Sequence, residues 1–139
     1  RMPNGHLLCI WNQQSEEEIR RGFIRTRIST AISRNGGIIW EHFQNVESLH
    51  EKTHVEPGPI ENVRPEGYGR WSYPSAYVAE DRVLIAYPYT VHDSRTTENV
   101  TPPGSSKLKV LPISWLYGGD DPQRESMVLK KIATLPPKP

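Results

Sequence analysis

The sequence has little cysteine and no long apolar run. Its one cysteine, Cys9, cannot form an intrachain disulfide, which excludes a disulfide-stapled scaffold. No apolar stretch approaches the length of a membrane-spanning helix, so we expect no membrane partner. The 17 basic and 16 acidic residues leave a formal net charge of +1, which gives no electrostatic reason to expect nucleic acid as a partner. We expect no cofactor, and the composition leaves the cellular compartment open.

Turn-forming residues are abundant instead. The 139 residues include 13 prolines and 10 glycines, and only 35% of the residues are hydrophobic. Such a chain has room for one domain, and its backbone must turn often.

The apolar and β-branched residues form short runs of the kind that build strands. We expect strands over residues 6–12, 23–33, 71–78, 83–89 and 107–116, and a further strand starting at 38–40 after a tight turn. A helical turn or loop is expected over 13–21, long polar loops over 47–69 and 92–106, and a short helix over 121–132. This spacing predicts an all-β fold with antiparallel sheets, either a sandwich or a propeller.

One turn carries a recognisable motif. The segment from Ser33 to Trp40 reads Ser-Arg-Asn-Gly-Gly-Ile-Ile-Trp. A serine hydroxyl and an Asn or Asp side chain can both bond backbone groups across a hairpin turn, and glycine supplies a positive φ. The tryptophan can pack beneath the turn. Ser33, Asn35, Gly37 and Trp40 thus resemble the Asp-box of sialidases, with Asn35 at the position of the family's aspartate.

Three other segments resemble the sialidase-like (BNR, or Asp-box repeat) β-propeller family. They are the opening residues 1–8, the segment 71–87 and the closing strand 108–116. The resemblance implies that residues 1–116 are C-terminal blades of a partial six-bladed propeller, with 117–139 as a tail that contains the short helix.

The resemblance also implies roles for individual residues. Sialidases bind a sugar carboxylate with three arginines, since a guanidinium fork donates two parallel hydrogen bonds. Arg25, eight residues before the box serine, matches one of these, and Arg27 is the reserve candidate. Tyr73 matches the family's nucleophilic tyrosine, and Tyr77 is second; a phenol needs a neighbouring base to attack an anomeric carbon. An ordinary surface role for Arg25 and for Tyr73 is an equally open alternative.

The rest of such an active site comes from earlier blades in the family. The chain alone is therefore expected to lack sialidase activity and to contribute to a sialidase-like glycoside hydrolase, or to a carbohydrate-binding propeller, only when other blades complete it. A related possibility is that several copies form a homo-oligomer that binds glycans.

A second motif points to a different class of protein. The segment His50-Glu51-Lys52-Thr53-His54 has the spacing of a zinc-protease helix, in which two histidines bind Zn²⁺ and the glutamate acts on water. Its flanks are polar and Pro57 follows closely, so a solvated loop is favoured. A small zinc-binding protein or metallohydrolase built on His50 and His54 is the alternative hypothesis.

Overall fold

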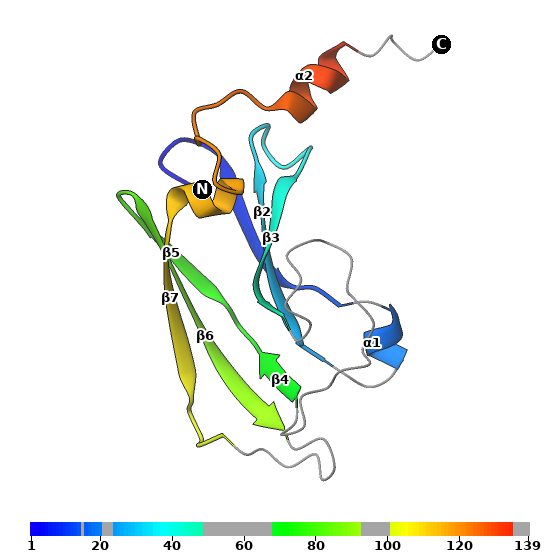
Figure 1. The fold of residues 1–139 in the computed structure, drawn as a ribbon, viewed down its shortest axis with the longest axis vertical. Helices are drawn as coiled ribbons and strands as arrows, with labels where there is room; N and C mark the ends of the chain where they lie inside the picture. The colour runs from blue at the N-terminus through cyan, green and yellow to red at the C-terminus, as the bar shows by residue number, and fades with distance from the viewer. Residues whose placement is uncertain (15, 21–23, 49–67, 93–100, 135–139) are drawn as a thin grey trace.

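The computed structural model describes residues 1–14, 16–20, 24–48, 68–92 and 101–134. Within these residues two antiparallel β-sheets pack against each other, and the chain then continues into two short helical segments (Figure 1). The predicted all-β class with antiparallel sheets is confirmed at this level. No helix in the described part of the chain is both long and apolar enough to cross a bilayer.

The first sheet has three strands. They are β1 (Leu7–Asn12), β2 (Arg27–Ser33) and β3 (Glu41–Ser48), hydrogen-bonded in that order. A short helix, α1 (Glu16–Arg20), lies between β1 and β2 in the sequence. Every residue of the central strand β2 is buried. The strand expected to start within 38–40 begins instead at Glu41, because Gly36 and Gly37 both have positive φ and the turn extends to Trp40.

The second sheet is built around a long strand, β6 (Arg82–His92). One end of β6 pairs with β4 (Tyr68–Trp71), the other end pairs with β5 (Ser75–Ala79), and β7 (Ser106–Pro112) also pairs with β6. The continuous strand expected over 71–78 is therefore interrupted. Tyr73 has a left-handed φ of 46° and Pro74 has no backbone N–H, so these residues do not continue a strand.

The chain ends in helical segments rather than in a longer last strand. After β7 the residues Ile113–Tyr117 form a 3-10 helix, η1, which Gly118 closes with a φ of 67°. The expected strand over 107–116 is thus correct only as far as Pro112. The expected C-terminal helix is present as α2 (Met127–Ala133), with the Ser126 side chain accepting the backbone N–H of Leu129.

The hydrophobic core lies between the two sheets. Alternate residues of β2 and β6, among them Ile28, Ile32, Val83 and Ile85, are fully buried in one cluster. Met2, Val46, Trp71, Tyr87, Leu116 and Tyr117 complete this cluster. The sheets therefore form one two-layered unit, and neither closes on itself within the described residues.

Candidate functional site

The turn between β2 and β3 has the bonds that its motif predicts. The Ser33 hydroxyl oxygen accepts the backbone N–H of Gly37 at 2.9 Å, and the hydroxyl donates to Asn35 Oδ1 at 3.1 Å. The same Asn35 oxygen accepts the backbone N–H of Ile39 at 2.9 Å. An asparagine thus makes the acceptor bonds that an aspartate could make, and Ser33 is fully buried while doing so.

The Trp40 side chain packs beside this turn. A Cβ placed on Gly37 would lie at ordinary van der Waals distance from both neighbours, 3.8 Å from the Trp40 ring and 3.7 Å from Leu7, so these two side chains lie beside the turn. The half-buried Trp40 also lines an apolar cavity of about 220 Å³ together with Cys9, Trp11, Ala31 and Phe43. The tryptophan therefore ties the turn to the outer face of the first sheet.

The two residues first proposed for sugar chemistry lie in direct contact. Arg25 Nη2 donates a hydrogen bond to the Tyr73 hydroxyl at 3.3 Å, and the guanidinium carbon lies 4.6 Å from the centre of the Tyr73 ring. Tyr73 is 72% exposed and Arg25 is partly exposed, so the pair is open to solvent. The structure thus brings together two side chains that are 48 residues apart in sequence.

Hydrogen bonds to backbone carbonyls hold this pair in place. The backbone N–H of Trp71 donates to the carbonyl oxygen of Arg25 at 2.8 Å. The side-chain amide of Asn12 donates to the carbonyl oxygens of Arg27 and Trp71, at 3.0 and 2.9 Å. These bonds fix the start of β2 against the end of β4, where Arg25 and Tyr73 lie.

The two reserve candidates lie elsewhere. Arg27 is only 1% exposed, so its side chain is buried within the protein rather than presented at the surface. Tyr77 is exposed on β5 and lines a groove of about 640 Å³ with residues of β1. Tyr73 precedes β5 in a left-handed conformation, so strand alternation does not place it on the face of Tyr77.

The zinc motif cannot be placed. His50, Glu51 and His54 lie outside the described residues, and the alternative that rests on them stays a prediction. Among the residues that the structure does describe, no group of three or more His, Cys, Asp or Glu side chains is arranged to hold a metal ion.

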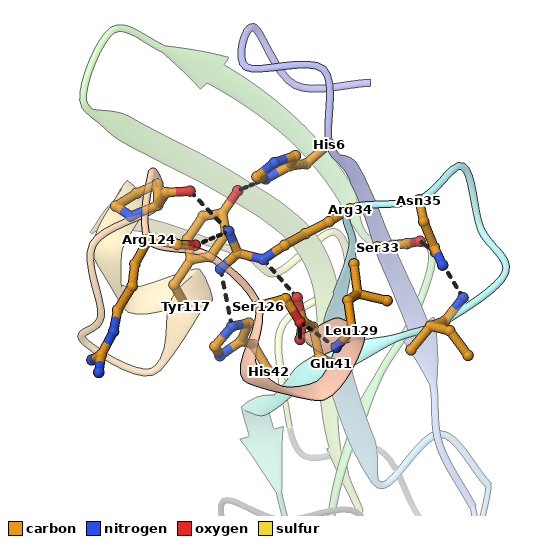
Figure 2. Close-up of polar contacts among 12 residues, drawn as sticks. His6, Ser33, Arg34, Asn35, Glu41, His42, Tyr117, Arg124, Ser126 and Leu129 are labelled. Atoms are coloured by element: carbon orange, nitrogen blue, oxygen red, sulfur yellow. Dashed lines mark hydrogen bonds and ion pairs between the residues drawn. The ribbon is translucent and has the colours of Figure 1, made fainter. Parts of the chain in front are cut away.

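A second polar cluster, to which none of the sequence motifs points, surrounds Arg34 (Figure 2). Arg34 Nε donates to Glu41 Oε1 at 2.6 Å, and both side chains are at most 10% exposed. Arg34 Nη1 donates to the carbonyl oxygens of Pro122 and Arg124, at 3.1 and 2.6 Å. The Ser126 hydroxyl donates to the second Glu41 oxygen at 2.6 Å. Opposite charges flanking a hairpin turn are the sequence signal for such a pair.

Two histidines and a tyrosine border this cluster. Arg34 Nη2 lies 3.4 Å from His42 Nε2, and the guanidinium carbon lies 5.1 Å from the centre of the Tyr117 ring. The Tyr117 hydroxyl is 2.7 Å from His6 Nδ1. Burial is the main cause that lowers the pKa of His42 and of His6. The Arg34 charge also lowers both, whereas Glu41 raises both, and at His42 the effect of Glu41 is the larger of the two. Both imidazoles are therefore held toward their neutral forms.

Comparison with protein-family models, curated proteins and solved structures gave no match. Two polar sites of the described residues differ in what they can do chemically. The exposed Arg25–Tyr73 pair can bind an anionic, partly apolar ligand, whereas the cluster around Arg34 joins two parts of the same chain.

Proposed function

We propose that this chain forms C-terminal blades of a sialidase-like β-propeller and contributes part of a binding site for a carboxylated glycan. The contact between Arg25 and Tyr73 carries the proposal. The family resemblance assigned a sugar-binding role to each residue separately, and neither assignment depended on the two being neighbours.

The chemistry of the pair fits a sugar acid. A guanidinium has five N–H donors in a planar fork, and the hydrogen bond to Tyr73 takes one of them. The remaining donors match the two oxygens of a carboxylate, which a lysine ammonium cannot bind in the same planar way. The exposed phenol ring adds an apolar face and a hydroxyl, both of which suit a pyranose ring.

The turn around Asn35 supports the same proposal. Ser33 and Asn35, which occupy the two polar positions of the Asp-box pattern, make three hydrogen bonds across the hairpin between β2 and β3. Each of the two antiparallel sheets would then correspond to one blade of the proposed six-bladed ring.

The contribution of this chain is recognition rather than complete catalysis. A phenol becomes an effective nucleophile only with a base beside it. Among the described residues, the hydrogen-bond partner of the Tyr73 hydroxyl is an arginine, which is no base at neutral pH. Hydrolysis of a glycosidic bond would therefore need a carboxylate from another part of the complete propeller.

The proposal predicts that the chain binds a free sugar acid more tightly than the methyl ester of the same sugar. We would titrate both into the isotope-labelled chain and follow its amide resonances by NMR. Arg25→Lys should weaken binding of the acid by about tenfold, because a charge-assisted fork contributes on the order of 1.5–3 kcal/mol. The matched control is Arg82→Lys, at an exposed arginine that pairs with Asp81. Equal binding of acid and ester, or no effect of Arg25→Lys, would contradict the proposal.

A further inference from the structure

The C-terminal segment is attached to the first sheet mainly by polar contacts. Helix α2 buries none of its own residues, and Met127, Val128 and Ile132 are all substantially exposed. Figure 2 shows the preceding residues lying against the β2–β3 hairpin, where Arg34 and Glu41 reach them. With so little apolar burial in α2, the attachment depends on these polar bonds.

Arg34 joins the two parts. Its guanidinium bonds Glu41 on β3 and, at the same time, the carbonyl oxygens of Pro122 and Arg124 in the C-terminal segment. Glu41 in turn accepts the hydroxyl of Ser126, the residue that caps α2. We call this set of four bonds the Arg34 latch. A fourth N–H of this guanidinium, on Nη2, is directed at His42, and a guanidinium loses binding energy if such a neighbour becomes a donor or a cation.

His42 is placed to act on this latch. Its Nε2 lies 3.4 Å from Arg34 Nη2, a position in which a neutral imidazole can accept a hydrogen bond and an imidazolium cannot. The charged and titratable groups around it are Arg34 and Glu41 from the hairpin, Tyr117 from η1, and Asp120, Arg124 and Glu125 from the segment before α2. A cavity of about 290 Å³ lies between the hairpin and the start of α2, and His42 lines it, which gives water access to the ring.

We propose that the Arg34 latch opens in acid, with His42 as its sensor. Protonation of His42 puts a second cation beside Arg34 and removes the acceptor for Nη2, so the hold on residues 120–129 weakens. The segment that carries α2 then separates from the hairpin while the two sheets stay folded. The carboxylates of Glu41 and Asp120 limit the effect but do not replace the lost acceptor.

The direction of the pH dependence follows from the environment of the ring. Burial holds the pKa of His42 below its usual range; among the neighbouring charges Glu41 acts most strongly and raises this pKa, Arg34 lowers it, and Asp120 raises it. A histidine whose folded pKa is depressed contributes stability above its ordinary pKa of about 6.5, and this contribution is lost as pH falls through the folded value. The latch is therefore closed at neutral pH and loosens in mild acid.

Amide hydrogen exchange tests the proposal on the full chain. We would measure exchange of residues 118–134 at about pH 7.5 and about pH 5, corrected for the intrinsic pH dependence of exchange. The opening equilibrium of the segment should rise roughly two- to fivefold in acid, the size expected for a partly exposed charge contact. His42→Gln, which retains an acceptor but does not titrate, should abolish the rise, and His92→Gln on β6 is the matched control that should preserve it.

Three results would overturn the proposal. One is a wild-type segment whose opening is the same at both pH values. Another is a rise that persists in His42→Gln, or that His6→Gln abolishes instead, since the sensor would then be another group. The third is an equal loss of protection in β2, because acid would then unfold the whole domain rather than release the segment.

Discussion

The turn at Asn35 offers the sharpest test of how this fold is held together. Asn35→Ala removes the oxygen that accepts both the Ile39 N–H and the Ser33 hydroxyl. A hydrogen bond contributes about 0.5–1.5 kcal/mol net, so the loss of two should lower the free energy of unfolding by about 1–3 kcal/mol. Ser33 is fully buried, which places the cost toward the upper end because water cannot replace the lost acceptor there.

Asn35→Asp should act in the opposite direction. A carboxylate makes hydrogen bonds roughly twice as strong as those of an amide oxygen, so we expect a gain of up to about 1 kcal/mol at neutral pH. The bonds would depress the pKa of the new carboxyl in the folded state. The gain should therefore be present above the ordinary aspartate pKa of about 3.9 and be lost as pH falls below it.

Urea unfolding followed by tryptophan fluorescence measures both changes, since the chain has four tryptophans. Gln123→Ala is the matched control, because it removes the same amide group from an exposed position and should change stability by less than about 0.5 kcal/mol. An Asn35→Ala variant as stable as this control would refute the assignment of the turn bonds as a main support of the hairpin.

Two further predictions concern the core. Gly69→Ala should destabilise by about 1–3 kcal/mol in the same urea assay, because the new Cβ would lie 2.7 Å from the buried Trp71 ring; a neutral effect would mean that the ring can move aside. Tyr87→Phe should also cost about 1–3 kcal/mol, since the Tyr87 hydroxyl donates to Glu47 at 2.5 Å. Burial and this carboxylate raise the pKa of Tyr87, so its contribution should be full below about pH 10 and shrink as pH rises above it; a stability difference between wild type and Tyr87→Phe that stays constant above about pH 10 would contradict this.

Local chemistry made the turn predictable from the sequence. All of its bonds join residues within four positions of one another, so the residue types at 33, 35 and 37 are enough to specify it. The Arg34 latch could not be predicted in the same way. Its partners Pro122 and Arg124 are 88 and 90 residues away and contribute backbone carbonyls, which carry no signature in the side-chain sequence.

Where a strand ends depends on the length of the neighbouring strand rather than on the alternation of apolar residues in the sequence. The apolar alternation over 107–116 continues past Pro112, but β6 begins at Arg82, which pairs with Pro112. Beyond that pair β6 has no residue with which β7 could form further strand hydrogen bonds. The N–H of Ile113 donates to the carbonyl oxygen of Asp81, and the chain continues as the 3-10 helix η1. The interruption at Tyr73 and Pro74 could have been predicted from the proline, which is disfavoured inside a strand. The alternation of apolar and polar residues does not take this into account.

Backbone strain gives an independent reason to connect the Arg25–Tyr73 pair with function. Among the described residues, four that are not glycine have positive φ: Arg25, His42, Tyr73 and Glu80. Glu80 lies in the two-residue connection between β5 and β6, where a tight hairpin requires that conformation. His42 lies where the register between β2 and β3 shifts, and the extra residue of such a β-bulge commonly has a positive φ. Arg25 and Tyr73 lie outside the strands and the tight hairpin turns, and each such conformation costs on the order of 1–3 kcal/mol. These two residues are the proposed sugar-binding pair, so the fold accepts strain at the two side chains whose direction matters most for that proposal.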